Sequence, residues 1–316
     1  MILVSGSSGF IGRRLTSTLR SDALPYRGMV RKPGTNTSAF VTDLADEYAL
    51  AQACAGVDCV FHCAGYAHAF ASRSGDDSAK HREVNFEGTR HLVDVAGRAG
   101  VRRFIFLSSV KAMAEPGENC VDEDFPGSPE TAYGQSKLAA EQSVLEAGRC
   151  YGMHVVNLRL AMVYGSGGRG NLERMGRLVA RGLFPPLPET GNHRSLVHVD
   201  DVVSAMRLVA ADDRANGRTY IVAGREAPSG RALYDALRQM QGLPPCRWSI
   251  PAAALRWAAG VGDGLEKMLG RRLPLNSEVL DRLLGSAWYS PNRIERELGW
   301  IARVSLLDGL SEMLRK

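Results

Sequence analysis

Hydrophobic runs alternate with amphipathic stretches along the first half of the chain. Short apolar runs predict strands at 2–6, 25–32, 58–65, 103–109 and 154–165. Stretches with helical periodicity lie between or beside them, at 10–21, 46–56, 82–100 and 132–152. Strands separated by helices join through right-handed crossovers, so the pattern predicts an α/β fold: a doubly wound parallel sheet with helices on both faces.

The alternation loosens after about residue 165, where GSGGRGN, LFPPLPETGNH and IPAAALRWAAGVGDG interrupt it. We expect a first domain over 1–165. Over 166–316 we expect mainly a smaller mixed lobe, with some segments returning to the sheet. The AAALRWAAG stretch is short and carries one basic residue, which favours a helix packed within this lobe over one that lies on a membrane surface.

Composition narrows the class of protein. The 316 residues are 45% hydrophobic and 23% charged, with 39 Lys and Arg against 34 Asp and Glu. The basic residues are spread along the chain, which disfavours nucleic acid and leaves room for an anionic small substrate. No apolar run reaches the roughly 18 residues of a membrane helix, and the first strand leaves no space for a signal peptide, so we expect a cytoplasmic protein.

The six cysteines are scattered, which disfavours a disulfide framework. Cys59, His62 and Cys63 lie close together in DCVFHCAG. A second ligand pair at zinc spacing is missing, and the run is typical of a buried strand, so we expect no metal.

Three glycines follow the first predicted strand and open the first predicted helix. Gly6, Gly9 and Gly12 form G-x-x-G-x-x-G around Phe10 and Ile11, one residue looser than the strict dinucleotide fingerprint. Glycines permit a tight turn, let the backbone approach a pyrophosphate and let the helix pack closely on the strand. The helix N-terminus offers free N–H groups to the same phosphates. This context favours a dinucleotide-binding loop over a structural turn.

Two basic residues stand at the end of the second predicted strand. An acidic residue about twenty positions after the glycines binds the adenosine ribose in NAD-dependent folds. Arg31 and Lys32 occupy that place, and a basic pair binds a 2′-phosphate instead. We therefore expect NAD(P) as the cofactor and favour NADP over NAD; the alternative is a solvated pair of charges beside a Pro-Gly turn.

Tyr133 and Lys137 form Y-x-x-x-K at the opening of a predicted helix. Four residues make about one helical turn, so both side chains share a face. Hydride transfer at an alcohol or ketone needs a proton donor or acceptor, and a phenol serves when a neighbouring ammonium lowers its pKa. Ser108 and Ser109 end a predicted strand, where parallel sheets hold ligands, and a hydroxyl there can bind the reacting oxygen. The alternative is an ordinary exposed Tyr/Lys pair.

The glycine loop, the strand-end serine and Y-x-x-x-K appear in one order on one alternating sheet. Together they resemble the extended short-chain dehydrogenase/reductases, particularly the nucleotide-sugar epimerases and reductases, over almost the whole chain. The resemblance implies a Rossmann fold and a homodimer formed through the helices near 78–100 and 131–152. It also implies that Tyr133 is the catalytic acid/base, that Lys137 lowers its pKa and holds the nicotinamide ribose, and that Ser109 orients the substrate oxygen.

The same resemblance implies further binding residues. It places Asp43 and Leu44 near the adenine, and Cys63, Ala64 and Gly65 along the dinucleotide. RSLVHVDDV is similar to the family's R-x-x-x-H-V-x-D segment, whose arginine meets the substrate diphosphate. The expected substrate-binding residues are Ser109, Lys111, Asn171, Arg194 and Arg282. Asn85 in EVNFEGT matches a family asparagine near the active centre; a structural role in its helix is the alternative.

Departures from the family patterns disfavour some of the reactions that the family catalyses. Val110 and Lys111 stand where 4,6-dehydratases carry an Asp-Glu pair, which disfavours dehydration. UDP-galactose 4-epimerases usually show an acidic end to the second strand and an asparagine near Met162, and both are absent from this sequence. We expect NAD(P)-dependent oxidoreduction at C4 of a nucleoside-diphosphate sugar, with UDP as the favoured nucleotide.

Several versions of this function stay open at this point. Reduction of a 4-keto sugar is favoured over 4-epimerisation with a retained NAD, because Arg31 suits exchangeable NADPH. One alternative is an NADPH-dependent ketone reductase whose substrate lacks a nucleotide. Another is a non-catalytic dinucleotide sensor.

Overall fold

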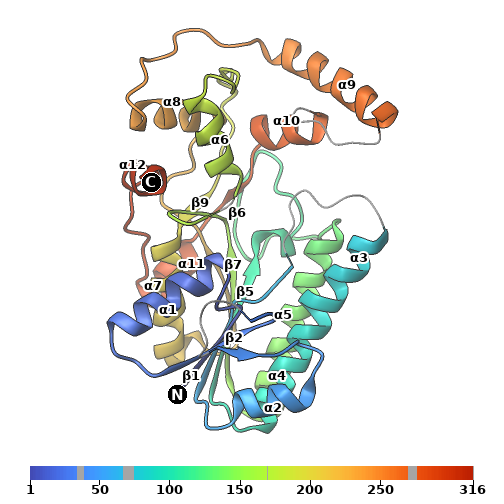
Figure 1. The fold of residues 1–316 in the computed structure, drawn as a ribbon, viewed down its shortest axis with the longest axis vertical. Coiled ribbons are helices and arrows are strands. Elements are labelled where there is room, and N and C mark those ends of the chain that lie inside the picture. The colour runs from blue at the N-terminus through green and yellow to red at the C-terminus, as the bar shows by residue number, and fades with distance from the viewer. Residues whose placement is uncertain (34–38, 67–74, 169, 270–275, 316) are drawn as a thin grey trace.

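A seven-stranded parallel sheet forms the centre of the computed structural model, which describes residues 1–33, 39–66, 75–168, 170–269 and 276–315. The strand order is β10-β7-β5-β4-β1-β2-β3, so the order reverses beside β1 (Figure 1). This confirms the predicted doubly wound fold. The strands of the sheet are β1 (Ile2–Ser5), β2 (Tyr26–Val30), β3 (Phe40–Val41), β4 (Cys59–His62), β5 (Arg103–Ser109), β7 (His154–Leu160) and β10 (Arg218–Val222).

Helices cover both faces of the sheet because successive strand residues point to opposite sides. Leu3 and Phe104 enter the core under α2 (Glu47–Cys54), α4 (Gly88–Arg98) and α5 (Ala132–Tyr151). Val4 and Ile105, their neighbours along the chain, enter the core under α1 (Phe10–Ser21), α7 (Val199–Ala211) and α11 (Asn292–Leu298). Both faces of each central strand are therefore buried, as the continuous apolar runs indicate.

Two predicted elements are divided in the structure. The helix expected at 82–100 begins earlier, as α3 (Gly75–His81), and passes through a π-helical turn, η1 (Arg82–Glu87), before α4. The strand expected at 154–165 breaks at Ala161. Beyond that residue β8 (Met162–Tyr164) leaves the main sheet and pairs with β9 (Leu196–His198). Apolar periodicity continues through both breaks, so the sequence pattern alone does not show them.

The remaining elements form a lobe over one end of the sheet (Figure 1). Its core includes Leu172, Leu233, Leu237 and Leu310. Its helices are α6 (Asn171–Ala180), α8 (Gly230–Met240), α9 (Ala252–Leu269), α10 (Ser277–Leu284) and α12 (Leu306–Leu314). A two-stranded ribbon, β6 (Cys120–Val121) with β11 (Trp288–Tyr289), and the short 3₁₀ turns η2 (Val110–Ala112) and η3 (Asp213–Ala215) complete the described elements. None of the described helices is long and apolar enough to cross a bilayer.

The carboxyl ends of the parallel strands lie at one edge of the sheet. Ser5 of β1 is in register with His62 of β4, and Ser109 of β5 with Leu160 of β7. Ligands of doubly wound sheets bind outside this edge, where the strand order reverses. The loops that follow β1, β4 and β5 therefore lie where a ligand is expected to bind.

Candidate active site

The chain turns from β1 into α1 through the three glycines. Gly6 has a φ of +65°, in the left-handed region that favours glycine. A Cβ on Gly12 would lie 2.2 Å from the Gly6 carbonyl oxygen. The helix then begins at Phe10 without a side-chain cap, so the first N–H groups, including that of Ile11, remain available to an anion. The turn thus has the close backbone approach and the free donors that a dinucleotide pyrophosphate requires.

Two basic side chains lie at the edge next to this turn. Arg31 and Lys32 directly follow β2, and both are exposed. The Ser7 N–H donates to the carbonyl of Met29 at 3.2 Å, which ties the glycine turn to the end of that strand. An adenosine 2′-phosphate extending from the turn would meet positive charge here.

The residues expected near the adenine follow β3. The Asp43 carboxylate accepts from the N–H of Ala45 at 3.1 Å, which closes a local turn. Leu44 packs against α4 at Gly88, where a Cβ would lie 2.9 Å from the leucine side chain. The structure therefore places Leu44 in a fixed apolar contact and Asp43 on the exposed side of the turn.

A chain of buried hydrogen bonds joins the ends of β1 and β4 to α4. Thr89 Oγ1 donates to the Asn85 carbonyl at 2.6 Å, so it accepts from His62 Nε2, 2.9 Å away. Ser5 Oγ then donates to His62 Nδ1 at 2.5 Å and accepts from the Ala64 N–H at 3.3 Å. Burial, helped by the nearby ammonium of the Y-x-x-x-K lysine, lowers the pKa of His62 to about 3. The imidazole is therefore neutral and fixes the loop after β4.

Tyr133 occupies the first turn of α5. The helix begins there because Thr131 accepts a hydrogen bond from the Gly134 N–H at 3.1 Å. At the end of β5, the Ser109 side chain lies close enough to the Tyr133 hydroxyl to lower its pKa. Ser109 Oγ also accepts from the Lys111 N–H at 3.2 Å, which holds the serine in place. The strand-end serine and the helix tyrosine thus meet as one hydroxyl pair.

Lys137 lies one turn further along α5 and is buried. Its Nζ donates to the Leu107 carbonyl at 2.9 Å and lies 4.6 Å from the centre of the Phe106 ring. Gly65 brings the loop after β4 beside it: a Cβ there would come within 3.4 Å of both Lys137 Nζ and Asn85 Oδ1. The lysine, the hydroxyl pair and this loop line one edge of the sheet.

Burial is the largest influence on the pKa values of Tyr133 and Lys137. It raises the pKa of Tyr133, against the lowering effect of the Ser109 side chain. It lowers the pKa of Lys137 to about 8, although Glu141 and the Cys63 sulfur act in the opposite direction. The resemblance implies a Tyr133 pKa lowered by Lys137, but in this structure the tyrosine pKa lies above its usual value. At neutral pH the phenol therefore keeps its proton.

The two strand-end serines face opposite ways. Ser108 Oγ donates to Glu141 Oε1 at 2.5 Å. Arg159 binds the same carboxylate through Nε at 3.0 Å and through a second nitrogen at 2.8 Å. The Glu141 and Arg159 side chains are only 3% and 12% exposed. Since this ion pair holds Ser108, Ser109 is the serine left at the tyrosine.

Two aromatic residues beside Tyr133 escaped the sequence analysis. The His81 ring meets Tyr133 edge-on, with ring centres 5.5 Å apart, and the Tyr66 ring packs against His81 with ring centres 5.0 Å apart. Asn85 Oδ1 accepts from the Tyr66 N–H at 2.7 Å, and its Nδ2 donates to the Tyr66 carbonyl at 3.0 Å. His81 stands four residues before Asn85, on the same helical face, a spacing that could have revealed it.

The expected substrate-binding residues lie partly together. Arg194 is half-buried and donates to the Gly285 carbonyl at 3.3 Å. Burial lowers its pKa, and the nearby positive charge of Arg282 lowers it further. Lys111 pairs with Glu115 at 2.6 Å. Asn171 is exposed at the start of α6, and the described hydrogen bonds do not join it to either arginine.

Possible metal ligands already have other partners. Burial raises the pKa values of Cys59 and Cys63 to about 12, so both remain thiols at neutral pH. Within the described residues, His198, Asp200 and Glu312 bring ligand atoms within 4.8 Å of one another. The Arg14 guanidinium, on α1, donates to the Asp200 carboxylate, and its Nη2 nitrogen lies 3.1 Å from a Glu312 carboxylate oxygen. This cation offsets part of the negative charge of the two carboxylates, and we assign no metal.

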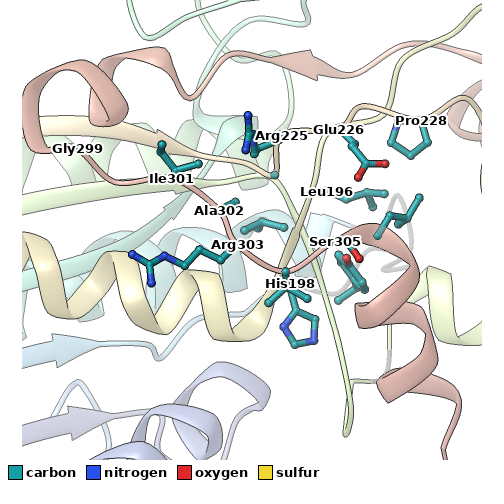
Figure 2. A pocket seen from close by; sticks show the side chains of 15 residues that line it. Leu196, His198, Arg225, Glu226, Pro228, Gly299, Ile301, Ala302, Arg303 and Ser305 are labelled. Atoms are coloured by element: carbon teal, nitrogen blue, oxygen red, sulfur yellow. The ribbon is translucent and has the colours of Figure 1, made fainter.

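A cavity of about 600 Å³ opens in the lobe between β9 and the segment that precedes α12 (Figure 2). His198, Arg225, Glu226, Arg303 and Ser305 contribute to its wall. The side chains of the two arginines extend in different directions in Figure 2 and do not converge on one point. None of the residues expected to bind cofactor or substrate lines it. We therefore keep the candidate active site at the carboxyl edge of the sheet.

A doubly wound sheet with a glycine turn, a strand-end serine and a Y-x-x-x-K helix defines an extended short-chain dehydrogenase/reductase of Rossmann type. The sequence model of the NAD dependent epimerase/dehydratase family matches residues 2–223. The chain belongs to this family. Membership supports an NAD-dependent enzyme of the nucleotide-sugar epimerase/dehydratase kind.

Relatives with known names act on different molecules. A UDP-glucose 4-epimerase of Vibrio cholerae is 29% identical and is matched over 98% of this chain and 93% of its own. Sterol demethylase protein B of Methylococcus capsulatus is 30% identical over 95% and 93% of the two chains. Among solved structures, MoeE5 in complex with UDP-glucose and NAD superimposes with a TM-score of 0.78 at 24% identity, over 99% of this chain and 96% of the other.

Proposed function

We propose that this chain catalyses NAD(P)-dependent oxidoreduction at C4 of a nucleoside-diphosphate sugar, with Tyr133 as the acid/base. The Ser109–Tyr133 hydroxyl pair beside buried Lys137 carries the proposal. Bound nicotinamide dinucleotide would supply or accept the hydride. The Tyr133 hydroxyl gives its proton to the oxygen at C4, and Ser109 hydrogen-bonds the same oxygen. Lys137 orients the nicotinamide ribose.

The protonated state of Tyr133 suits a reduction step. A ketone that receives a hydride becomes an alkoxide, which needs a proton donor. Burial raises the pKa of Tyr133, so the phenol holds that proton at neutral pH. An epimerase also includes such a step, so the choice rests on Arg31, whose charge suits exchangeable NADPH: we favour a 4-keto-sugar reductase over a 4-epimerase that retains NAD.

We propose NADP as the preferred cofactor because Arg31 and Lys32 are exposed beside the glycine turn. An Arg31→Asp variant removes a bidentate partner of the 2′-phosphate and adds a charge that repels it. We expect the Kd for NADPH to rise about tenfold to a hundredfold, while the Kd for NADH stays unchanged or falls. Equal effects on both cofactors would contradict this preference.

The remaining proposed cofactor contacts involve three loops. The first-turn N–H groups after Gly6, Gly9 and Gly12 would hold the phosphates, and Asp43 and Leu44 would hold the adenine end. Cys63, Ala64 and Gly65 would line the dinucleotide, and Gly65 lies beside Lys137.

Two nearby arginines support a diphosphate substrate. The charge of Arg282 disfavours the charged form of half-buried Arg194, and a diphosphate bound between them would relieve that repulsion. Lys111 and Asn171 complete the proposed substrate-binding set. The UDP-glucose named for the MoeE5 structure and for the Vibrio cholerae relative has this chemistry.

One further candidate has support from a relative. Sterol demethylase protein B is named for a substrate without a nucleotide, so a ketone reductase of that kind stays the second candidate. A non-catalytic sensor has less support, because Tyr133, Ser109 and Lys137 are all brought together.

We also propose a cytoplasmic homodimer paired through α4 and α5, for which sedimentation equilibrium is the test.

The test is turnover of UDP-glucose, UDP-N-acetylglucosamine and a UDP-4-keto-6-deoxy sugar, each with and without added NADPH. A reductase consumes the keto sugar only with NADPH, whereas interconversion without added cofactor would establish an epimerase. An Arg194→Ala variant should raise KM about tenfold or more through the lost charge-assisted hydrogen bonds. No turnover of these sugars, or an unchanged KM, would favour the nucleotide-free substrate.

A further inference from the structure

Helix α9 presents an apolar face to solvent. Leu255 and Ala259 point into the core of the lobe, as expected for a helix packed within it. The opposite face carries Trp257, Val261 and Leu265, which are 76%, 44% and 41% exposed. These three residues are spaced four apart, so they form one stripe along the helix. Alanine and glycine fill the other outward positions of the stripe, at 253, 260 and 264.

Helix α9 lies at the outer margin of the lobe, away from the central sheet (Figure 1). The helix is 18 residues long, which corresponds to about 27 Å. Trp248, on the segment leading to it, is a second large aromatic residue, 63% exposed. Large apolar side chains exposed together on a protein surface mark interaction sites.

The charges beside the stripe are unequal. Arg247 and Arg256 are exposed, and no ion pair joins either of them to another described residue. The acidic residues of the helix face inward: Asp263 accepts from the Ser277 hydroxyl at 2.6 Å, and Glu266 accepts from the Asn276 side chain at 2.9 Å. The available charge at the margin of the stripe is therefore positive.

We propose that α9 and the tryptophan before it form a docking surface for an anionic lipid membrane. The helix would lie in the plane of the interface, with Trp257, Val261 and Leu265 between the headgroups and the acyl chains. Arg247 and Arg256 would contact lipid phosphates. A second copy of the chain fits less well, since a two-fold interface on this stripe would bring like charges of the two copies toward each other.

This surface was missed from the sequence because the AAALRWAAG stretch appeared to be a short helix with one basic residue. In the structure the helix extends to Leu269, and a second arginine and a second tryptophan precede it. The inference does not depend on the proposed reaction, because none of its residues belongs to the candidate active site.

The test is co-flotation of the full chain with vesicles of phosphatidylcholine alone and of phosphatidylcholine mixed with phosphatidylglycerol. We expect binding to the anionic vesicles, weakened by salt, with a blue shift of tryptophan fluorescence. Leu265→Glu should weaken binding about tenfold or more. Leu307→Glu is the matched control: it changes a leucine with the same 41% exposure on α12 and should leave binding unchanged.

A charge variant separates the two parts of the surface. Arg256→Gln should lower affinity for anionic vesicles about fivefold and leave any binding to neutral vesicles unaltered. Circular dichroism and NADPH binding should match the wild type in every variant, and Val261→Ser replaces Leu265→Glu should that variant fail to fold. Absence of wild-type flotation, or equal losses from Leu265→Glu and Leu307→Glu, would overturn the proposal. So would a dimer that Leu265→Glu dissociates without any vesicle binding.

Discussion

Lys137 provides a direct test of the electrostatics of the site. Its ammonium is buried, and its pKa is lowered from 10.5 to about 8. A Lys137→Met variant removes the buried charge and keeps a side chain of similar length. We expect the variant to be inactive and, at neutral pH, more stable than the wild type.

The expected size follows from the pKa difference. A shift of about 2.5 units, at about 1.4 kcal/mol each, means that charged Lys137 destabilises the folded state by about 3 kcal/mol below pH 8. The unfolded chain binds more protons between about pH 8 and 10.5, so the unfolding free energy of the wild type rises with pH there. Loss of the hydrogen bond to the Leu107 carbonyl offsets the gain of the variant by about 1–2 kcal/mol.

Urea unfolding of both proteins at about pH 7 and about pH 9.5 measures this difference. The variant should be about 1–2 kcal/mol more stable at the lower pH, and that advantage should shrink by about 2 kcal/mol at the higher pH. Lys80→Met, which removes an exposed lysine, is the control and should show no such pH dependence. A difference between wild type and Lys137→Met that is the same at both pH values would refute the reasoning.

Two further variants test the framework of the site. Glu141→Gln leaves its buried arginine partner without a full counter-charge, so urea unfolding should show a loss of about 3 kcal/mol; a loss below about 1 kcal/mol would contradict a structural role for the pair. Gly12→Ala places a Cβ 2.2 Å from backbone oxygen, whereas Gly9→Ala leaves 3.1 Å, so calorimetry should show that NADPH affinity falls far more in the first variant. Equal affinities in the two alanine variants would mean that close packing of α1 is not what shapes the phosphate turn.

The sequence predicted the fold class because its strands are buried on both faces and its helices are amphipathic. Neighbouring apolar residues such as Phe104 and Ile105 point to opposite faces of the sheet. Both are buried when a layer of helices covers each face. The break at Ala161 and the π-helical turn η1 could not be predicted in this way. Apolar periodicity continues through both breaks. The strand divides where β8 pairs with β9, and the helix divides at η1; neither is visible in the local sequence pattern.

The candidate site was predictable where a motif carries its own spacing, as in the glycine turn and Y-x-x-x-K. The preference for Ser109 over Ser108 stays a prediction, supported by the hydrogen bond that Ser108 donates to Glu141. His81 was missed although it stands four residues before Asn85, because the sequence analysis did not connect that helical face with Tyr133, about fifty residues further along the chain. The raised Tyr133 pKa depends on burial, which a motif does not encode.

The central claim is that Tyr133 gives a proton to the oxygen at C4 of a nucleotide sugar while hydride reaches the carbon. Mass spectrometry of the product formed from a UDP-4-keto-6-deoxy sugar and NADPH deuterated at nicotinamide C4 tests it most directly. We predict one deuterium at sugar C4 with the wild type, and product formation that is at least about a hundredfold slower with Tyr133→Phe at unchanged NADPH affinity. Deuterium-free product, or equal rates for the two proteins, would contradict the account.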